Sequence, residues 1–262
     1  MSRVPALFVS HGSPMFALDP GKLGPSLQRI GESLPGLAAI VVVSPHWQTH
    51  GVRITGATTP ETIHDFGGFP APLYALQYPA QGAPHIATQV LELLQASGFD
   101  AAIDGERGLD HGAWVPLRYL KPEADVPVLQ VSQPHDMDAS AAFKLGQALA
   151  PLREHGVLVI GSGSLTHNLL DVRRQVDDPQ YAQAFAEWVA DAVVHGHLDA
   201  LVHYRALAPH AIRAHPTEEH FLPLLVAAGA SKADEPGRLV EGGMTYGVLS
   251  MDSFVFGLPA RT

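Results

Sequence analysis

The sequence has 262 residues and contains no cysteine. This absence excludes disulfide bonds, thiolate metal sites, iron–sulfur clusters and cysteine nucleophiles. Any metal ion must therefore be held by histidine, carboxylate or backbone oxygen ligands. Basic residues are also few, 16 against 26 acidic residues, and the formal net charge is −10. Because no basic stretch is present to neutralise phosphates, we expect no nucleic-acid partner.

Long apolar runs are missing as well. No run reaches the roughly 20 residues that a membrane-spanning helix needs. The N-terminus lacks the long apolar region and the small-residue cleavage site of a signal peptide. With 46% hydrophobic and 16% charged residues, the composition is that of a globular protein. We therefore expect a soluble cytoplasmic protein with no membrane partner.

Short apolar runs alternate with longer helical patterns along the chain. The main predicted strands are Ala6–Ser10, Ala39–Ser44, Val128–Ser132 and Val157–Ile160, with an edge strand at Val52–Thr55 and a final strand at Thr245–Val255. Helices are predicted over Leu23–Leu34, Pro84–Ser97, Ala139–His155 and Pro179–His195. This alternation predicts an α/β fold with a largely parallel central sheet flanked by helices on both faces. No linker or repeat marks a boundary, so we expect a single domain over residues 1–262.

Fifteen histidines are present, and three of them follow predicted buried strands. His11 follows the first strand, His46 follows the second, and His167 comes after a Gly-Ser-Gly-Ser turn. A polar residue just beyond the carboxyl end of a strand lies where open α/β sheets bind their ligands. Imidazole is a common metal ligand, so this repeated placement predicts a metal site on which the rings converge.

A fourth histidine, His220, lies in the segment Pro216–Leu225, where we predict a helix that begins near Thr217. Glu218 and Glu219 precede it, so either carboxylate is an alternative ligand, or an acidic residue favoured by the helix dipole. The histidines do not fall four residues apart on one face of a helix, so this is not the pattern of the helical zinc proteases.

His111 is the fifth candidate and stands between Asp110 and Gly112. A single histidine is most often a hydrogen-bonded structural residue, but the recurring positions favour a common site. Because its ordinary pKa lies near neutrality, a histidine beside a metal can act as a general acid or base.

The segment Thr59–Pro84 is long for a connection between elements of a compact domain. Connections of that length are often functional. Its centre, which includes His64 and Phe69, mixes aromatic and polar side chains as a substrate-covering loop would. The alternative interpretation is that this segment is an irregular surface loop.

Three other kinds of site fit the sequence poorly. The turn Gly161–Leu165 lacks the lysine and the spacing of a phosphate-binding loop. It also misses the Gly-x-Ser-x-Gly elbow of serine hydrolases, which leaves Ser13 and Ser164 as weak candidates for a nucleophile. The residues after the first strand, His11–Pro14, do not supply the Gly-x-Gly-x-x-Gly pattern of dinucleotide-binding folds.

Six motifs recur along the chain in the order of one known family. They are Phe8–Met15, Val43–Trp47, Thr62–Pro70, Asp110–Trp114, Thr166–Asn168 and Pro216–Leu225. Together they resemble the 4,5-DOPA extradiol dioxygenase family, a branch of the class III extradiol ring-cleavage dioxygenase superfamily. The resemblance extends over nearly the whole chain, and the ordered set is far more specific than any fragment alone.

The resemblance implies a single catalytic domain that inserts O2 into a catechol such as DOPA, in aromatic compound catabolism. It implies a metal held by His11, His46 and His220, with His167 either a fourth ligand or an acid–base group. His111 and His167 are then the catalytic histidines, and His64 and Phe69 line the catechol pocket.

The implied cofactor is one divalent metal ion. Fe(II) is expected for activity, whereas Zn(II) is the alternative in the purified protein because an all-histidine site suits zinc well. The expected partners are the small-molecule catechol and O2, and we expect a monomer or a homodimer.

Two other functions on the same fold are kept as alternatives. One is a zinc-dependent hydrolase, and the other is a non-catalytic metal-binding protein of the Memo type. A binding protein has no evident need for His111 and His167 in addition to metal ligands. Few basic residues occur in the motif loops, and Arg118, Arg173 and Arg213 are the candidates for contacting a substrate carboxylate.

Overall fold

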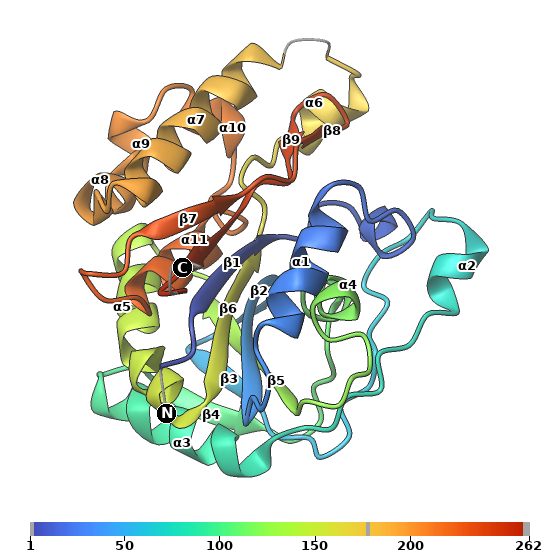
Figure 1. The fold of residues 1–262 in the computed structure, drawn as a ribbon, viewed down its shortest axis with the longest axis vertical. Helices are drawn as coiled ribbons and strands as arrows, with labels where there is room; N and C mark the ends of the chain where they lie inside the picture. The colour runs from blue at the N-terminus through green and yellow to red at the C-terminus, as the bar shows by residue number, and fades with distance from the viewer. Residues whose placement is uncertain (1–2, 177–178, 259–262) are drawn as a thin grey trace.

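An eight-stranded sheet forms the centre of the molecule in the computed structural model, which describes residues 3–176 and 179–258 (Figure 1). The strand order across the sheet is β4, β3, β5, β2, β6, β1, β10 and β7. In chain order the strands are β1 (Ala6–Ser10), β2 (Ala39–Thr49), β3 (Val52–Thr55), β4 (Ala101–Asp104), β5 (Val128–Pro134), β6 (Val157–Gly163), β7 (Gly237–Val240) and β10 (Ser253–Phe256).

The four central strands β5, β2, β6 and β1 all run parallel. On one side β3 joins β5 antiparallel and carries β4 parallel to itself, so β3 lies inside the sheet and is not the predicted edge strand. On the other side β10 and β7 are added antiparallel. These observations confirm the predicted α/β fold with a mostly parallel sheet.

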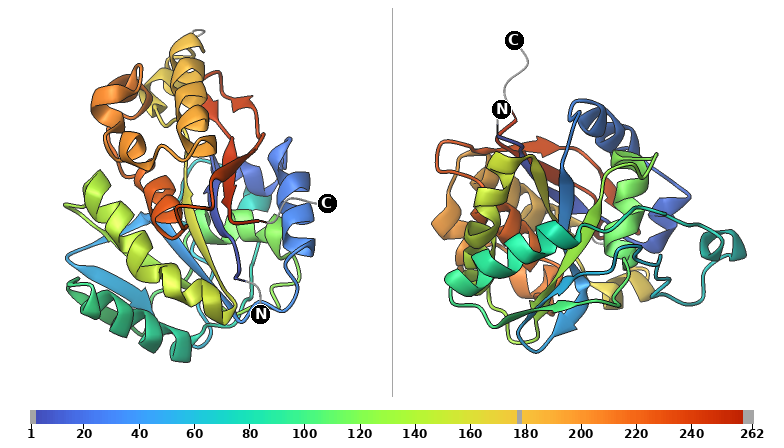
Figure 2. Two further views of the ribbon diagram at one scale, coloured as in Figure 1. Left: turned by 60° about the vertical axis from the view of Figure 1, so that its left-hand side comes forward. Right: turned by 90° about the horizontal axis from the view of Figure 1, so that it is seen from below.

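Helices cover both faces of the sheet, as the turned views show (Figure 2). One face packs against α1 (Leu23–Glu32) and α4 (His111–Leu120), and the other packs against α3 (Pro84–Ala96), α5 (Ala139–Leu149) and α11 (Leu222–Gly229). The remaining helices are η1 (Pro14–Ala17), α2 (Ala71–Tyr74), η2 (Ala150–His155), α6 (Leu169–Arg173), α7 (Gln180–Val194), α8 (Leu198–Val202), α9 (Tyr204–Leu207) and α10 (Ala211–Ala214). No helix in the described ranges is both long enough and apolar enough to cross a membrane.

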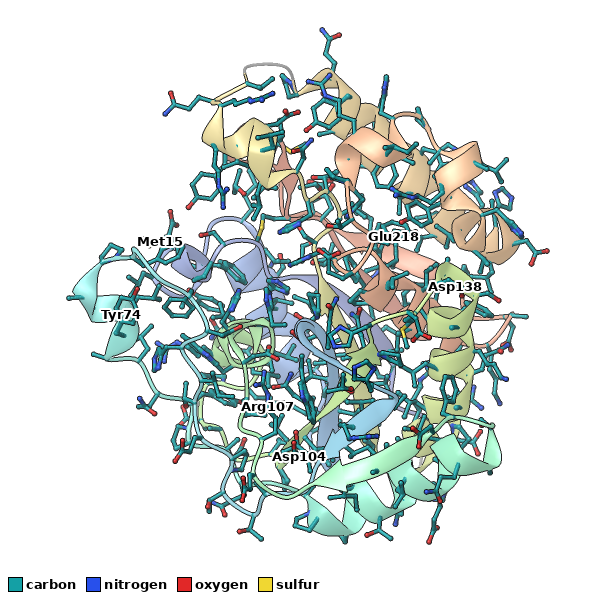
Figure 3. The ribbon with its side chains drawn as sticks, turned by 180° about the vertical axis from the view of Figure 1, so that it is seen from behind. Met15, Tyr74, Asp104, Arg107, Asp138 and Glu218 are labelled. Atoms are coloured by element: carbon teal, nitrogen blue, oxygen red, sulfur yellow. The ribbon has the colours of Figure 1, made fainter. Side chains whose placement is uncertain are left out.

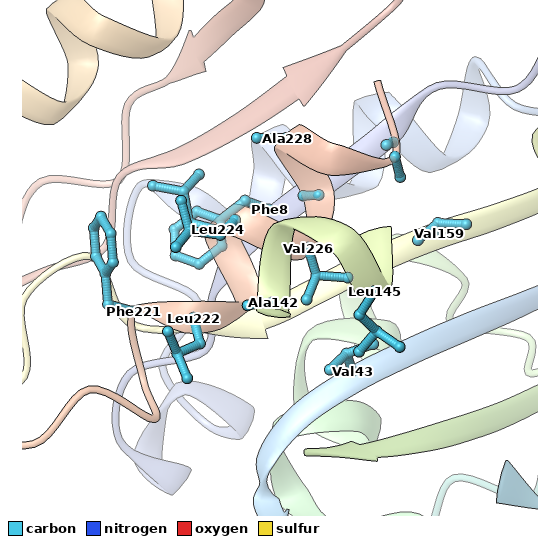
Figure 4. Packing of buried hydrophobic residues seen from close by; sticks show 14 of the residues in the cluster. Phe8, Val43, Ala142, Leu145, Val159, Phe221, Leu222, Leu224, Val226 and Ala228 are labelled. Carbon is cyan, nitrogen blue, oxygen red and sulfur yellow. The ribbon is translucent and has the colours of Figure 1, made fainter. Parts of the chain in front are cut away.

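The helix α11 is completely buried between the sheet and α5 (Figure 4). All eight of its residues are apolar or glycine, so the helix has no polar face that could meet solvent. Side chains such as Leu224 and Val226 each contribute about 1.5–3 kcal/mol through burial. Because α11 is held on all sides, the turn that precedes it is held as well.

Proline or glycine explains three of the predicted boundaries that were wrong. Pro223 lacks an N–H donor and is tolerated only in a first turn, so α11 begins at Leu222 and not near Thr217. Pro151 likewise ends the helix predicted over Ala139–His155 at Leu149, and a 3-10 turn follows.

The strand predicted over Thr245–Val255 is divided into three. A three-residue turn over Tyr246–Val248, in which Tyr246 and Gly247 have positive φ, joins β8 (Met244–Thr245) to β9 (Leu249–Ser250) in a separate hairpin. The chain then re-enters the main sheet as β10.

The segment Thr59–Pro84 runs along one side of the molecule and contains the short helix α2. Figure 3 labels Tyr74 on α2 and Met15 on η1, and these two short helices are in contact with each other. Tyr74 is 38% exposed at the outer end of this segment.

Two glycines of β6 allow the first turn of α11 and the turn that precedes it to lie directly on the sheet. A Cβ at Gly161 would overlap the backbone oxygen of Pro223, and a Cβ at Gly163 would overlap the backbone oxygen of His220. The Gly-Ser-Gly-Ser sequence is therefore a packing surface, which explains why it lacks the features of a phosphate loop.

We predict that Gly161→Ala and Gly163→Ala each lower the free energy of unfolding by about 1–3 kcal/mol, because backbone must move to admit the methyl group. Urea unfolding followed by circular dichroism measures this change. Gly105→Ala is the matched control, since a Cβ there meets nothing within 4 Å. An effect of Gly163→Ala no larger than that of the control would contradict the packing argument.

Candidate metal centre

Five histidines converge at the carboxyl ends of the central strands. His11 follows β1, His46 lies near the end of β2, His111 begins α4, and His167 and His220 precede α6 and α11. Ring centroids lie 5.0 Å apart for His11 and His46, 3.9 Å for His46 and His111, and 5.1 Å for His46 and His220. His167 stacks on His220 at 3.5 Å, with an interplanar angle of 9°.

An irregularity in β2 directs His46 toward the cluster. Pairing with β5 is regular as far as Val43 and resumes only at Gln48. Bulges of this kind often lie beside functional sites, where they turn a side chain away from the regular alternation. The strand thus continues past the predicted end at Ser44 and includes the histidine, which we had expected after it.

A buried carboxylate fixes His111 at the start of α4. Asp110 is fully buried and caps the helix by accepting a hydrogen bond from the backbone N–H of Ala113. Its oxygens also accept hydrogen bonds from Ser44 Oγ at 2.8 Å and Gln130 Nε2 at 2.7 Å. Burial raises the pKa of Asp110, and these donors oppose that shift. The helix start is therefore locked to β2 and β5.

In two of the rings, a side-chain oxygen lies within hydrogen-bond distance of Nδ1. His11 Nδ1 lies 3.0 Å from Ser162 Oγ, and His220 Nδ1 lies 2.9 Å from Glu219 Oε1. The Nε2 atoms of His11 and His46 lie 3.1 Å apart, so these rings present Nε2 toward each other. Metal-binding histidines commonly engage an oxygen through the second ring nitrogen, which fixes the orientation of the ring. Ser162 and Glu219 thus position the rings that they touch.

Asp65 lies beside the cluster and was not singled out from the sequence. It accepts a hydrogen bond from the backbone N–H of His111 at 2.9 Å, and its other oxygen lies 3.0 Å from His111 Nδ1. The same oxygen is 3.7 Å from His46 Nδ1. Burial alone would raise the pKa of Asp65, but its interactions with His111 lower the pKa to about 2. Asp65 is therefore a fixed negative charge next to two imidazoles.

Burial keeps four histidines of the cluster, His11, His46, His167 and His220, uncharged. It lowers the pKa of His46 to about 3 and that of His167 to about 4. Burial, reinforced by repulsion between neighbouring rings, also holds the pKa values of His11 and His220 well below their usual range. A neutral imidazole is the form that binds metal ions, so no proton has to leave these rings at neutral pH.

The donor atoms form two adjoining sets that could each hold a metal ion. The first consists of His11, His46 and His111, and the second of His167, Glu219 and His220, with ligand atoms within 4.8 Å of one another in each set. Neutral, buried nitrogen donors with a carboxylate nearby fit a divalent transition metal. The structure therefore brings together all five histidines singled out from the sequence, and it places His111 as close to His11 and His46 as the others.

A cavity of about 470 Å³ opens onto the cluster. Its wall includes His46, His111, Phe66, Phe69 and the hairpin residue Tyr246. Phe66 and Phe69 meet edge to face, with their ring centroids 5.5 Å apart. The cavity can therefore receive a flat aromatic molecule against a wall of aromatic rings.

Among the described residues, His64 is not part of the cavity wall. Its Nε2 lies 3.0 Å from the backbone oxygen of Leu76. Its ring packs edge to face against Phe66 and Trp114, at 5.7 Å and 5.6 Å. His64 thus supports Phe66 from behind, whereas Phe69 faces the cavity. Spacing in the sequence does not distinguish these two positions.

Comparison with known proteins gives a consistent result. Residues 5–257 match the family described as the catalytic LigB subunit of aromatic ring-opening dioxygenase. The chain is 41% identical to the 4,5-DOPA dioxygenase extradiol of Beta vulgaris over 95% of both chains, and 41% identical to that of Escherichia coli K12 over 98% of this chain and 96% of the relative. A crystal structure of an uncharacterised E. coli K12 protein superposes with a TM-score of 0.82, at 36% identity, over 97% of this chain and 100% of the other.

Acidification should destabilise the metal-free protein. Unfolded histidine titrates near pH 6.5, whereas His46, His167 and the buried His215 have folded pKa values of about 3 to 4. Below about pH 6.5 the unfolded chain therefore binds protons that the folded chain excludes, and stability falls as the pH drops. Each such histidine contributes a loss of about 1.4 kcal/mol per pH unit.

Urea unfolding of chelator-treated protein at pH 7.5, 6.0 and 5.0 measures this dependence. We expect little change above pH 7 and a steep loss between pH 6 and pH 5. An unfolding free energy that stays constant from pH 7.5 to pH 5.0 would mean that these rings are not buried as neutral groups.

Proposed function

Because this chain belongs to the family of the catalytic LigB subunit of aromatic ring-opening dioxygenases, and is itself an extradiol aromatic ring-opening dioxygenase, we propose that it cleaves a catechol such as DOPA with one divalent metal ion. The observation that carries this proposal is the convergence of five histidines, three of them buried and two half-buried, beside a cavity whose wall includes aromatic rings. No observation favours the hydrolytic or the non-catalytic alternative.

His11, His46 and His220 are the proposed ligands of the metal. The oxygen contacts of Ser162 and Glu219 support this choice, because they leave Nε2 of the rings that they touch for coordination. Fe(II) is the proposed ion, and Zn(II) is the ion that this all-nitrogen donor set would also accept. When bound, the iron supplies the Lewis acidity that makes the catechol hydroxyl groups acidic and the redox chemistry that activates O2.

His111 is the proposed general base. Its ring lies at the inner end of the cavity, next to His46, where a catechol hydroxyl group would approach. Asp65, held at 3.0 Å from Nδ1, favours the tautomer that leaves Nε2 free to accept a proton. The same carboxylate stabilises the imidazolium that results. Asp65 is therefore a positioning residue for His111.

His167 is the proposed group for the later proton transfer that accompanies ring opening. Its stacking on His220 leaves it beside the metal position and exposed to the cavity. Because burial lowers its pKa to about 4, the ring is neutral before the reaction, and a proton received during turnover is readily given up. The stacked arrangement favours this role over that of a fourth ligand.

Phe69 and Phe66 are proposed to hold the catechol ring. An edge-to-face pair at the cavity wall offers both a ring face and a ring edge for contact, and such contacts contribute about 0.5–1.5 kcal/mol beyond area burial. His64 acts indirectly, through Phe66. A cytoplasmic location, a role in aromatic catabolism and a monomeric or homodimeric state stay predictions from the sequence.

Reconstitution with Fe(II) under nitrogen, followed by addition of a catechol and air, tests the function. We expect O2 uptake and a yellow ring-opened semialdehyde with at least one member of a panel that includes DOPA, protocatechuate and 4-methylcatechol. Zinc-loaded protein should consume no O2, since zinc has no redox chemistry. A complete panel with no O2 uptake by the iron-loaded protein would contradict the proposal.

Two alanine variants separate ligands from acid–base groups. His220→Ala should lose bound metal, whereas His111→Ala should retain it and lose turnover by about 10²–10⁴-fold. Metal content by mass spectrometry and O2 uptake are the two readouts. The control variant is His85→Ala, because His85 is an exposed histidine. If His111→Ala also loses the metal, the ligand set is His11, His46 and His111, and the general base must be sought elsewhere.

A further inference from the structure

One face of the helix α6 forms part of the cavity wall. Leu169, Val172 and Arg173 all line the cavity, and their spacing of three and four residues places them on one side of the helix. Arg173 is the only lysine or arginine among the described residues of that wall. A single guanidinium, on an exposed residue, therefore joins a wall whose other described residues are histidines, aromatic, apolar and small residues.

The orientation of α6 is fixed by polar contacts on its other side. Asn168 caps the helix by accepting a hydrogen bond from the backbone N–H of Asp171 at 3.1 Å, and it donates one to the backbone oxygen of Arg213 at 2.8 Å. Asp171 is 8% exposed and lies 3.2 Å from Arg213 Nε. These contacts hold the opposite face, which carries Arg173, toward the cavity.

The guanidinium group of Arg173 has no bonding partner within the described part of the chain. No hydrogen bond or ion pair of its guanidinium is present there, and its side chain is exposed at the cavity mouth. The other two arginines considered from the sequence are engaged elsewhere. Arg213 pairs with Asp171 and lies 3.9 Å from the ring centroid of Tyr181, and Arg118 Nη1 lies 3.4 Å from the backbone oxygen of Gln77.

The hairpin β8–β9 contributes another polar group to the cavity wall. Tyr246 lines the cavity and is 54% exposed, and its φ of 49° is rare for a residue other than glycine. The tight turn that it forms with Gly247 imposes this conformation, which keeps the phenol at the mouth. Figure 1 shows the hairpin next to α6, so the mouth offers hydrogen-bond donors from two neighbouring elements.

We propose that Arg173 binds the carboxylate of a side chain on the catechol and thereby selects anionic catechols, an inference that rests on the proposed function. The protein carries a formal charge of −10, so without a local cation an anionic substrate would be repelled. A guanidinium matches a carboxylate in a two-pronged geometry, and the hydrogen bonds are strengthened by charge. The aromatic wall of the cavity holds the catechol ring, while the side chain of the substrate reaches outward to Arg173.

DOPA and dopamine form a matched pair for the test, because they differ only in the carboxylate. Arg173→Met keeps most of the side-chain length and removes the charge. Its neighbour Arg174 lies outside the cavity wall, so Arg174→Met is the control. For Arg173→Met we expect kcat/KM for DOPA to fall about tenfold, mainly through KM, with less than a twofold change for dopamine. Arg173→Lys should recover part of the loss, and higher ionic strength should reduce the difference between the substrates.

Equal losses for DOPA and dopamine, or no loss for either, would overturn the proposal. Anaerobic titration calorimetry of zinc-loaded protein with each compound separates it from the proposed function. If no catechol is cleaved but Arg173→Met binds DOPA about tenfold more weakly with dopamine unaffected, the proposed function fails and the role of Arg173 stands. If binding of DOPA is unchanged in Arg173→Met, the role of Arg173 fails.

Discussion

Five imidazole rings can share one buried cluster only if nearly all of them remain uncharged. Burial and mutual repulsion enforce this state, and they lower the pKa of His46 to about 3 and that of His167 to about 4. Asp65 adds a fixed negative charge beside His111 and His46, and the carboxylate of Glu219 lies against His220. Neutral nitrogen donors with carboxylates beside them are suited both to hold a metal ion and to exchange a proton with a substrate.

The sheet makes this cluster possible because its parallel strands end at one edge. β1 and β2 bring His11 and His46 there directly, and a bulge in β2 adjusts the second. His220 reaches the same edge from a different direction, and the glycines of β6 leave room for its backbone. Burial of α11 then fixes that backbone, so the histidine cluster depends on the hydrophobic core.

The sequence predicted the histidine constellation because its signals are local. A buried strand that ends in histidine is recognisable from residues such as Val9 and His11 alone. The fold class followed from the alternation of strands and helices for the same reason. Tertiary contacts were harder to foresee: Asp65 meets His111 across 46 positions of sequence, and Ser162 meets His11 across 151. Nothing near Arg173 in the sequence distinguishes it from Arg174, because only the direction of α6 separates them.

The central claim is that both atoms of O2 enter the ring of a catechol at this histidine cluster. The most direct measurement is mass spectrometry of the product formed by iron-loaded protein from DOPA under ¹⁸O2, trapped by borohydride reduction before the aldehyde oxygen exchanges with water. We predict a ring-opened product that carries both labelled atoms. A ring-opened product whose added oxygen is unlabelled and so comes from water, or an unlabelled quinone with the ring intact, would contradict the claim.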